Sequence, residues 1–303
     1  MAMRQRPPLP TLQTLEANLP TFLMVALVAI LYGPLLAHWC DGWLNKTIST
    51  EHEYFSHGLI GLPFAAYLCW TQRQQWNDLP NPTFNRDSGL GLILLAFSVV
   101  LYHTNLSDLV NFSFPLVLVG LCLWFKGLPG LQLLWFPLLL TVLATPNQIP
   151  YLIAPYTLPL QQFIASVAGF ILMQLGIDVE VDQIYLFVND RIVEVAPYCA
   201  GLKMLFTSLY VGLMLVYWTG AWTSRAKTTL FFIGIVVISV AANVIRNTLL
   251  TFFHGTGREQ AFTWLHDSWG GDLYSALMLG LLVVLLRGIE RLIVSPPAPT
   301  QSV

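Results

Sequence analysis

The sequence predicts an all-α polytopic membrane protein with about eight transmembrane helices, one interfacial or re-entrant helix and a small external β-hairpin. Composition is the first reason, because 55% of the 303 residues are hydrophobic and only 10% are charged, whereas soluble domains carry about 25% charged residues. The second is a series of apolar runs near the length of about 20 residues that crosses a hydrocarbon core. The third is an alternating stretch, 177–195, that breaks the helical pattern.

The apolar runs are the candidate transmembrane helices. They cover residues 21–38, 57–71, 88–103, 109–125, 130–145, 200–220, 228–253 and 269–289. Segment 21–294 is therefore expected to form a single transmembrane domain. A cytoplasmic tail, 1–20, is expected before it, and a proline-rich, disordered tail, 295–303, after it.

Basic residues predict the orientation, because cytoplasmic segments of membrane proteins are enriched in Lys and Arg. Arg4 and Arg6 place the N-terminus inside the cell, and Arg287 and Arg291 place the C-terminus inside. The orientations predicted from the two ends of the chain agree only if the further apolar segment 158–176 does not cross the membrane, or crosses and returns. We therefore expect that segment to be interfacial or re-entrant on the outer side.

Alternation of polar and apolar residues predicts strands between this segment and the next helix. Residues 178–182 alternate strictly, and two apolar stretches flank a turn at Asn189-Asp190. Such a pattern is typical of a β-hairpin. The predicted hairpin insertion, about 177–195, ends shortly before Cys199.

Three residues are the candidate catalytic groups, since polar and ionisable residues in membrane helices are costly and commonly functional. Cys199 begins a helix, where the positive end of the helix dipole favours the thiolate, and Lys203 adds positive charge one turn later. His266 precedes the last helix and could exchange a proton with the thiol and the leaving amine. Arg246, inside an apolar helix, stays protonated and could stabilise an oxyanion or hold a substrate carboxylate.

Each candidate also fits a purely structural role. A cysteine near the end of a membrane helix commonly serves packing, and a histidine beside an aspartate in a loop is commonly solvated. Arg246 could extend its side chain to the interface or pair with Asp272. The stronger argument is that all three fall on the outer side in the predicted topology.

Four motifs, in order, resemble the exosortase/archaeosortase family of prokaryotic membrane proteins. Cys199–Lys203 resembles its cysteine motif, in which Gly201 occupies the glycine position, and Asn243–Arg246 resembles its N-x-x-R motif. His266–Gly270 resembles its H-x-x-x-G motif, and Ser56-His57-Gly58 opens an apolar helix as in the family. The resemblance covers roughly residues 50 to 290. Within the family, the chain is similar to the cyanobacterial branch.

The resemblance implies a Cys/Arg/His site formed by Cys199, Arg246 and His266, with Asn243, Lys203, Gly201 and His57 in supporting roles. It implies cleavage of C-terminal tripartite (PEP-CTERM-like) sorting signals through an acyl-enzyme on the cysteine. The implied partners are sorting-signal segments of exported, membrane-tethered proteins, an exopolysaccharide or lipid acceptor, and the bilayer. The implied location is the prokaryotic cytoplasmic membrane, with the active site facing outside.

Two features of the motifs leave alternatives open. Pro197-Tyr198 and Ala200 depart from the residues that commonly flank the family's cysteine. His254, eight residues after Arg246, is a competing candidate for the catalytic histidine, and His266 is favoured because Gly270 follows it.

Other functions remain in competition. A non-catalytic transporter or exopolysaccharide-assembly subunit would show a polar path or inverted repeats, and a structural partner of another membrane enzyme would need none of the three side chains. No cofactor is expected, and the cysteine spacing predicts no metal site. The net charge of −2 provides no basic surface for nucleic acid.

Overall fold

The computed structural model describes residues 12–44, 54–80, 86–196, 201–266 and 268–293. In the first half of the chain the helices are α1 (Leu12–Leu44), α3 (Gly58–Thr71), α4 (Arg73–Asp78), α5 (Arg86–Tyr102), α6 (Ser107–Leu133) and α7 (Trp135–Ala144). Then come α8 (Ile149–Ile153), the 3-10 turn η1 (Ala154–Thr157), α9 (Leu158–Gln174) and strands β1 (Glu180–Asp182), β2 (Tyr185–Val188) and β3 (Arg191–Glu194). The chain continues with α10 (Leu202–Thr219), η2 (Ala221–Thr223), α11 (Arg225–Gly255), α12 (Glu259–His266) and α13 (Trp269–Leu292).

Six helical segments within the described residues are long and apolar enough to cross a membrane, and this confirms a multi-pass membrane protein. They are Ala26–Leu44, Ser107–Leu133, Ile149–Gln174, Leu202–Thr219, Arg225–Gly255 and Trp269–Leu292, and two shorter apolar helices are Gly58–Thr71 and Trp135–Ala144. The predicted number of eight spanning helices is not confirmed. The fold is helical, as the apolar runs predicted, apart from one small sheet.

Two boundaries differ from those expected. Helix α1 begins at Leu12, inside the expected N-terminal tail, because residues 12–20 are mostly good helix formers. The expected run 130–145 is divided, since α6 ends at Leu133 and α7 begins at Trp135. Gly127 in α6 has a φ of 63° and is followed by Pro129, so the chain turns there before α7 starts. The expected tail 295–303 lies outside the described residues.

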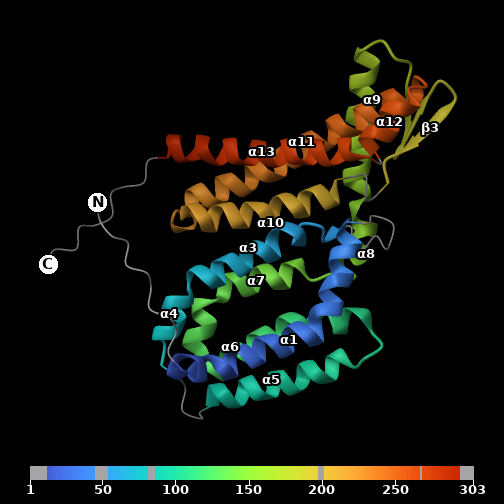
Figure 1. The fold of residues 1–303 in the computed structure, drawn as a ribbon. Coiled ribbons are helices and arrows are strands. Elements are labelled where there is room, and N and C mark those ends of the chain that lie inside the picture. Colours follow the sequence, from blue (N-terminus) through green and yellow to red (C-terminus); the bar gives the residue numbers. More distant parts are fainter. Residues whose placement is uncertain (1–11, 45–53, 81–85, 197–200, 267, 294–303) are drawn as a thin grey trace, which may run out of the picture.

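Most helices run side by side in two groups. In Figure 1, α10, α11 and α13 form one group, α1, α5 and α6 form the other, and α3 and α7 lie between them. Tyr210 of α10 connects the first group to the helices between the groups, because its hydroxyl donates a hydrogen bond of 2.9 Å to the carbonyl of Leu140 on α7. Its ring lies so close to Gly61 of α3 that an added Cβ would stand 1.9 Å from the hydroxyl oxygen.

Helix α9 differs in direction from the others. Figure 1 shows it nearly upright at the end of the molecule where α10 begins and α11 ends, whereas α10, α11 and α13 run across the picture. By length and composition its segment could cross a membrane. The interfacial or re-entrant position expected for 158–176 stays a prediction, to which this direction lends support.

The hairpin expected around Asn189-Asp190 is confirmed, and a further strand precedes it. Strands β1, β2 and β3 form an antiparallel sheet in that order, with Leu186 opposite Val193. Asn189 and Asp190 both have positive φ values, 48° and 62°, the conformation of a type I′ turn. The alternating residues 180–182 form the additional strand.

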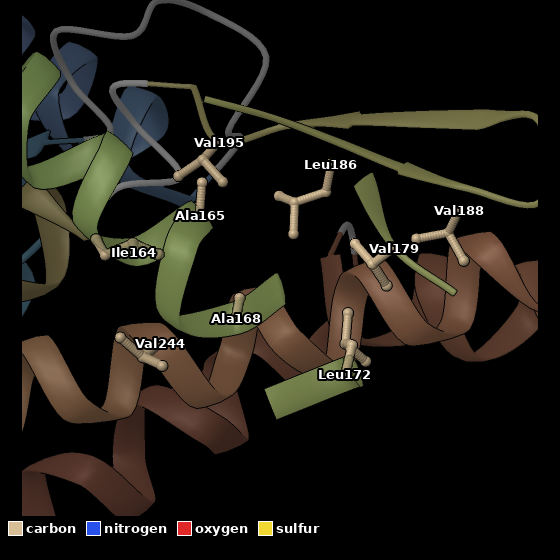
Figure 2. Packing of buried hydrophobic residues seen from close by; sticks show 9 residues of the cluster. All are labelled: Ile164, Ala165, Ala168, Leu172, Val179, Leu186, Val188, Val195 and Val244. Carbon is tan, nitrogen blue, oxygen red and sulfur yellow. The ribbon is translucent and has the colours of Figure 1, made fainter. Parts of the chain in front are cut away.

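The sheet is attached to the helices by a hydrophobic cluster. Figure 2 shows its nine side chains, which come from α9, the strand region and Val244 of α11. Leu186 of β2 and Leu172 of α9 are fully buried in it. Gly169 lets the strand approach, since a Cβ there would lie 2.3 Å from Val181. The cluster fixes the sheet against α9 and α11.

Candidate active site

The predicted nucleophile, Cys199, lies outside the described residues, as do its neighbours 197–200. The residues on either side of this segment are described. Upstream, Val195 is fully buried, and its carbonyl accepts a hydrogen bond of 2.8 Å from Nε2 of Gln161 on α9. Downstream, Gly201 is the N-cap residue of α10. Cys199 comes two positions before Gly201, and chain geometry limits their Cα atoms to a separation of about 7 Å.

Gly201 is held against α11. It has a φ of 81°, a left-handed conformation that favours glycine. A Cβ at this position would lie 2.6 Å from Cγ and 2.8 Å from Nδ2 of Asn243. The glycine expected from the cysteine motif and the asparagine expected from the N-x-x-R motif are therefore in direct contact. Two motifs that are far apart in the sequence meet at one place.

Arg246 lies one turn after Asn243 on α11 and is half-buried. No carboxylate among the described residues forms an ion pair with it. Its positive charge acts on the hydroxyl of Tyr274, a residue of α13. Measured from Lys227, Arg246 lies roughly 28 Å along the helix axis, towards the C-terminal end of α11. Among the described residues, no ion pair joins Arg246 to Asp272.

The polar residues around Asn243 are buried. Asn243 is 1% exposed and Asn247 is 3% exposed. Nδ2 of Asn247 donates to the main-chain oxygen of Asn243 at 2.9 Å and to its side-chain Oδ1 at 3.3 Å. Tyr274 donates its hydroxyl hydrogen to the carbonyl of Ala242. The Tyr274 bond holds this part of α11 against α13, whereas the Asn247 bonds lie within α11.

The two candidate histidines both contact one aromatic ring. The ring of Phe262 on α12 stacks on His266 at a centroid distance of 5.2 Å and an interplanar angle of 9°. The same ring lies 5.2 Å from the ring of His254 at the end of α11. Both histidines are half-buried, so the contacts alone do not decide between them.

His254 belongs to a polar network at the end of the sheet that carries the Asn189-Asp190 turn. Its Nδ1 lies 3.5 Å from Oε2 of Glu259, and its carbonyl accepts a hydrogen bond of 3.0 Å from Arg191 on β3. Arg191 also forms an ion pair with Glu259. The Arg191 hydrogen bond is the largest influence on the Glu259 carboxyl and holds its pKa below the ordinary value. These interactions hold His254 in place, which fits a structural role.

His266 ends α12, and the chain turns sharply into α13. A Cβ on Gly270 would lie 2.5 Å from the ring of Trp264 and 2.6 Å from its carbonyl oxygen. The glycine of the H-x-x-x-G motif is thus needed for the close packing of the α12–α13 corner. That corner sets where His266 stands relative to the helices that carry Arg246 and Gly201.

The structure also describes Lys203 and His57, two residues that were expected to support the site. Lys203 is half-buried in the first turn of α10. His57, 4% exposed, precedes α3, where Nε2–H donates to the carbonyl of Leu143 at 3.1 Å and the ring packs 4.4 Å from the ring of Tyr210. His57 therefore sits in the interface of α3, α7 and α10, which fits a structural role.

Three residues of this region were not singled out from the sequence. They are Gln161, which binds the main chain before the cysteine segment, Asn247, which binds Asn243, and Tyr274, which lies near Arg246. A signal was available for Asn247, because a polar residue four positions after Asn243 lies on the same helix face. Among the described residues, no cluster of His, Cys, Asp and Glu could hold a metal ion.

Comparison with known protein families identifies the chain. The family model described as transmembrane exosortase matches residues 43–283, which includes every residue of the candidate site. No curated protein and no solved structure matched the chain. The match covers the sheet as well as α3 to α11, most of α13 and both candidate histidines. This chain therefore belongs to the transmembrane exosortase family.

Proposed function

We propose that this chain is a membrane-embedded cysteine peptidase or transpeptidase that cleaves C-terminal tripartite (PEP-CTERM-like) sorting signals at the outer face of the cytoplasmic membrane. The observation that carries the proposal is the half-buried Arg246 without a carboxylate partner among the described residues, one turn from the Asn243–Gly201 contact. An unpaired cation in an apolar helix is costly. A substrate carboxylate or a developing oxyanion would supply the missing negative charge.

The chemistry requires a cysteine, an acid–base group and a cation. The thiolate of Cys199 attacks the scissile carbonyl carbon, a C–S bond forms, and the negative charge moves to the carbonyl oxygen, where Arg246 stabilises it. Collapse of this tetrahedral intermediate breaks the C–N bond, and His266 gives its proton to the leaving amine. A thioester between the substrate and Cys199 remains.

The second half of the reaction releases the product. A water molecule or an acceptor hydroxyl or amine attacks the thioester and loses its proton to His266, and the C–S bond breaks. Water gives hydrolysis, and an exopolysaccharide or lipid acceptor gives transfer. In this proposal both termini are cytoplasmic, and the sorting-signal segment approaches from the bilayer.

The test uses the full chain in membranes with an exported reporter that ends in a tripartite sorting signal. The unaltered chain is expected to shorten the reporter, and Cys199→Ala is expected to leave it uncut at an equal level of membrane insertion. Arg246→Gln is expected to lower the rate by about 100- to 1,000-fold, as with loss of one oxyanion donor. Arg246→Lys, which keeps the charge but not the planar fork, should recover part of that loss.

Trapping of the thioester tests the covalent route directly. Hydroxylamine added during turnover should release the reporter as a hydroxamate if a thioester on Cys199 forms. Cleavage that persists in Cys199→Ala would rule out this mechanism. Two results together would favour a non-catalytic role in transport or assembly. The unaltered chain would leave the reporter uncut, and variants with the side chain of Cys199, Arg246 or His266 truncated would function normally in cells.

A further inference from the structure

One face of α12 carries an acidic, an aromatic and an imidazole side chain. Glu259, Phe262 and His266 are spaced by three and four positions, so they share a face of this eight-residue helix. Only residues 256–258 separate α12 from the end of α11. Glu259 and Phe262 both contact His254 in the last turn of α11. The shared face is therefore turned towards the end of α11.

The first turn of α12 is attached to the sheet as well. Arg191 of β3 forms an ion pair with Glu259 and donates a hydrogen bond of 3.0 Å to the carbonyl of His254. One guanidinium therefore joins β3, the end of α11 and the start of α12. Together these contacts keep the start of α12 beside the His254 ring, one turn before Phe262.

Phe262 links this attachment to His266. Its ring centroid lies 5.2 Å from that of His254, at an interplanar angle of 48°, and 5.2 Å from that of His266, at an angle of 9°. Aromatic rings attract each other at centroid distances of about 4.5–7 Å, and an offset parallel arrangement is a preferred one. A turn of the Phe262 ring would alter both contacts at once. The plane of the His266 imidazole thus depends on a ring that is itself held from α11.

The plane of an imidazole matters for proton transfer because both ring nitrogens lie in it. The second side-chain torsion of histidine has a broad distribution, so the rotamer alone does not fix this plane. His266 is half-buried, and a stacked ring covers one of its faces while the edges that carry the nitrogens stay available. An acid–base group acts only within hydrogen-bond reach of its proton, and a displacement of about 1 Å can cost about 100-fold in rate.

Resting on the proposed function, in which His266 exchanges the proton, we infer that Phe262 is a positioning residue that holds the imidazole plane of His266 for this transfer. Phe262 acts on the histidine and not on the bound peptide, so its loss lowers kcat and leaves KM nearly unchanged. The ring of His254 supports Phe262 from the end of α11. Its removal leaves the stack on His266 in place, and its effect on kcat is therefore smaller.

The first measurement needs no peptide substrate. It records the ring proton signals of isotope-labelled histidine by NMR in the full chain in lipid nanodiscs, with the His266 signals assigned by His266→Gln. A stacked benzene ring shifts these signals through its ring current. Phe262→Leu removes the ring and keeps an apolar side chain, so the His266 signals should move towards the position of an unstacked imidazole. Phe262→Tyr keeps the aromatic ring and should leave them close to the parent.

The second measurement follows cleavage of the sorting-signal reporter. Phe262→Leu should lower kcat by about tenfold, near the upper end of what one aromatic pair contributes, with KM nearly unchanged. Phe262→Tyr should restore most of the parent kcat. Phe170→Leu is the matched control, because the same substitution then removes a ring that is 58% exposed on α9. This control should leave kcat and the His266 signals unchanged.

Three results would overturn the inference. The first is an unchanged set of His266 signals in Phe262→Leu. The second is an unchanged kcat in that variant, and a raised KM beside it would place the ring against the substrate instead. The third is an equal loss of kcat in Phe262→Tyr although its His266 signals match the parent.

Two further points keep the outcomes separable. If Phe262→Leu fails to insert, Phe262→Met removes the ring with a more adaptable side chain and carries the same test. A parent chain that leaves the reporter uncut contradicts the proposed function, whereas the NMR signals alone decide whether Phe262 orients His266.

Discussion

Gly201 and Asn243 touch across the α10–α11 interface so closely that a methyl group on the glycine would lie 2.6 Å from Cγ of the asparagine. The contact joins the cysteine motif to the N-x-x-R motif and thereby places the start of α10 beside Arg246. Because Gly201 also has a φ of 81°, both its backbone and its surroundings exclude a side chain.

Replacing Gly201 should be more damaging than replacing the glycine at the other end of the same helix. Gly201→Ala combines backbone strain with the collision against Asn243, whereas Gly220→Ala, with a φ of 71°, meets no atom within 4 Å. We expect Gly220→Ala to destabilise by about 1 kcal/mol from strain alone and to retain cleavage. Gly201→Ala should lower the unfolding temperature further and abolish cleavage, as measured by thermal unfolding in detergent and by the reporter. Equal effects of the two changes would contradict the importance of the contact.

The two histidines should differ in their contribution to the reaction. His254 is held by Glu259 and Arg191 at the base of the sheet, whereas His266 stands at the α12–α13 corner. His266→Ala should therefore lower the cleavage rate by about 100- to 10,000-fold, the usual contribution of general acid–base catalysis. His254→Ala should stay within a few fold of the parent in initial-rate measurements. A reversed order would assign the acid–base role to His254.

The core under the sheet should decide whether the sheet stays attached. Leu186 is fully buried against α9, so Leu186→Ala should destabilise the protein by about 2–5 kcal/mol through lost burial and a cavity. Ile192 on β3 is 57% exposed, and Ile192→Ala should change stability by no more than about 0.5 kcal/mol. Limited proteolysis at the Asn189-Asp190 turn would report the difference. Similar sensitivity of both variants would show that this cluster does not anchor the sheet.

The link between the sheet and α12 should weaken in acid. Arg191 holds the pKa of Glu259 below its ordinary value of 4.5. A lowered pKa in the folded state means that the carboxylate stabilises the fold above the ordinary pKa and that this contribution disappears as pH falls through the lowered value. The protection factors of the β3 amides, which correct exchange rates for their intrinsic pH dependence, should therefore fall below about pH 4.5. Glu259→Gln should exchange faster at pH 7 and converge with the parent in acid. Parallel curves at all pH values would exclude this contribution.

Parts of the fold were predictable because they depend on local properties of the chain. Apolar runs such as 228–253 are evident from hydropathy alone, and the Asn189-Asp190 turn has the residues that positive φ values favour. The division at Leu134 was not predictable, because the residues on both sides of it are apolar. The number of spanning helices was also beyond local reasoning, since the direction of α9 depends on how it packs against α11 and the sheet.

The candidate site also has features that were predictable from the sequence and features that were not. Arg246, Asn243 and His266 were identified because ionisable and polar residues are conspicuous in apolar sequence, and the family match to residues 43–283 confirms the resemblance that they carried. Gln161 was visible only as a polar residue in an apolar segment, and its bond to the carbonyl of Val195 required the positions of both segments. The role of Asn247 became evident only from its bond to Asn243 and from the contact of Asn243 with Gly201.

The sequence by itself determined that this protein is a helical membrane protein of the exosortase family, and which residues are chemically capable of catalysis. Hydropathy, turn residues and motif order depend on residue type and short spacing, so they are present in the chain before it folds. Only the tertiary structure decided that Gly201 rests on Asn243, that Phe262 contacts both His254 and His266, and that Arg246 lacks a carboxylate partner among the described residues. These relationships depend on the packing of side chains from helices distant in sequence, which no local pattern encodes.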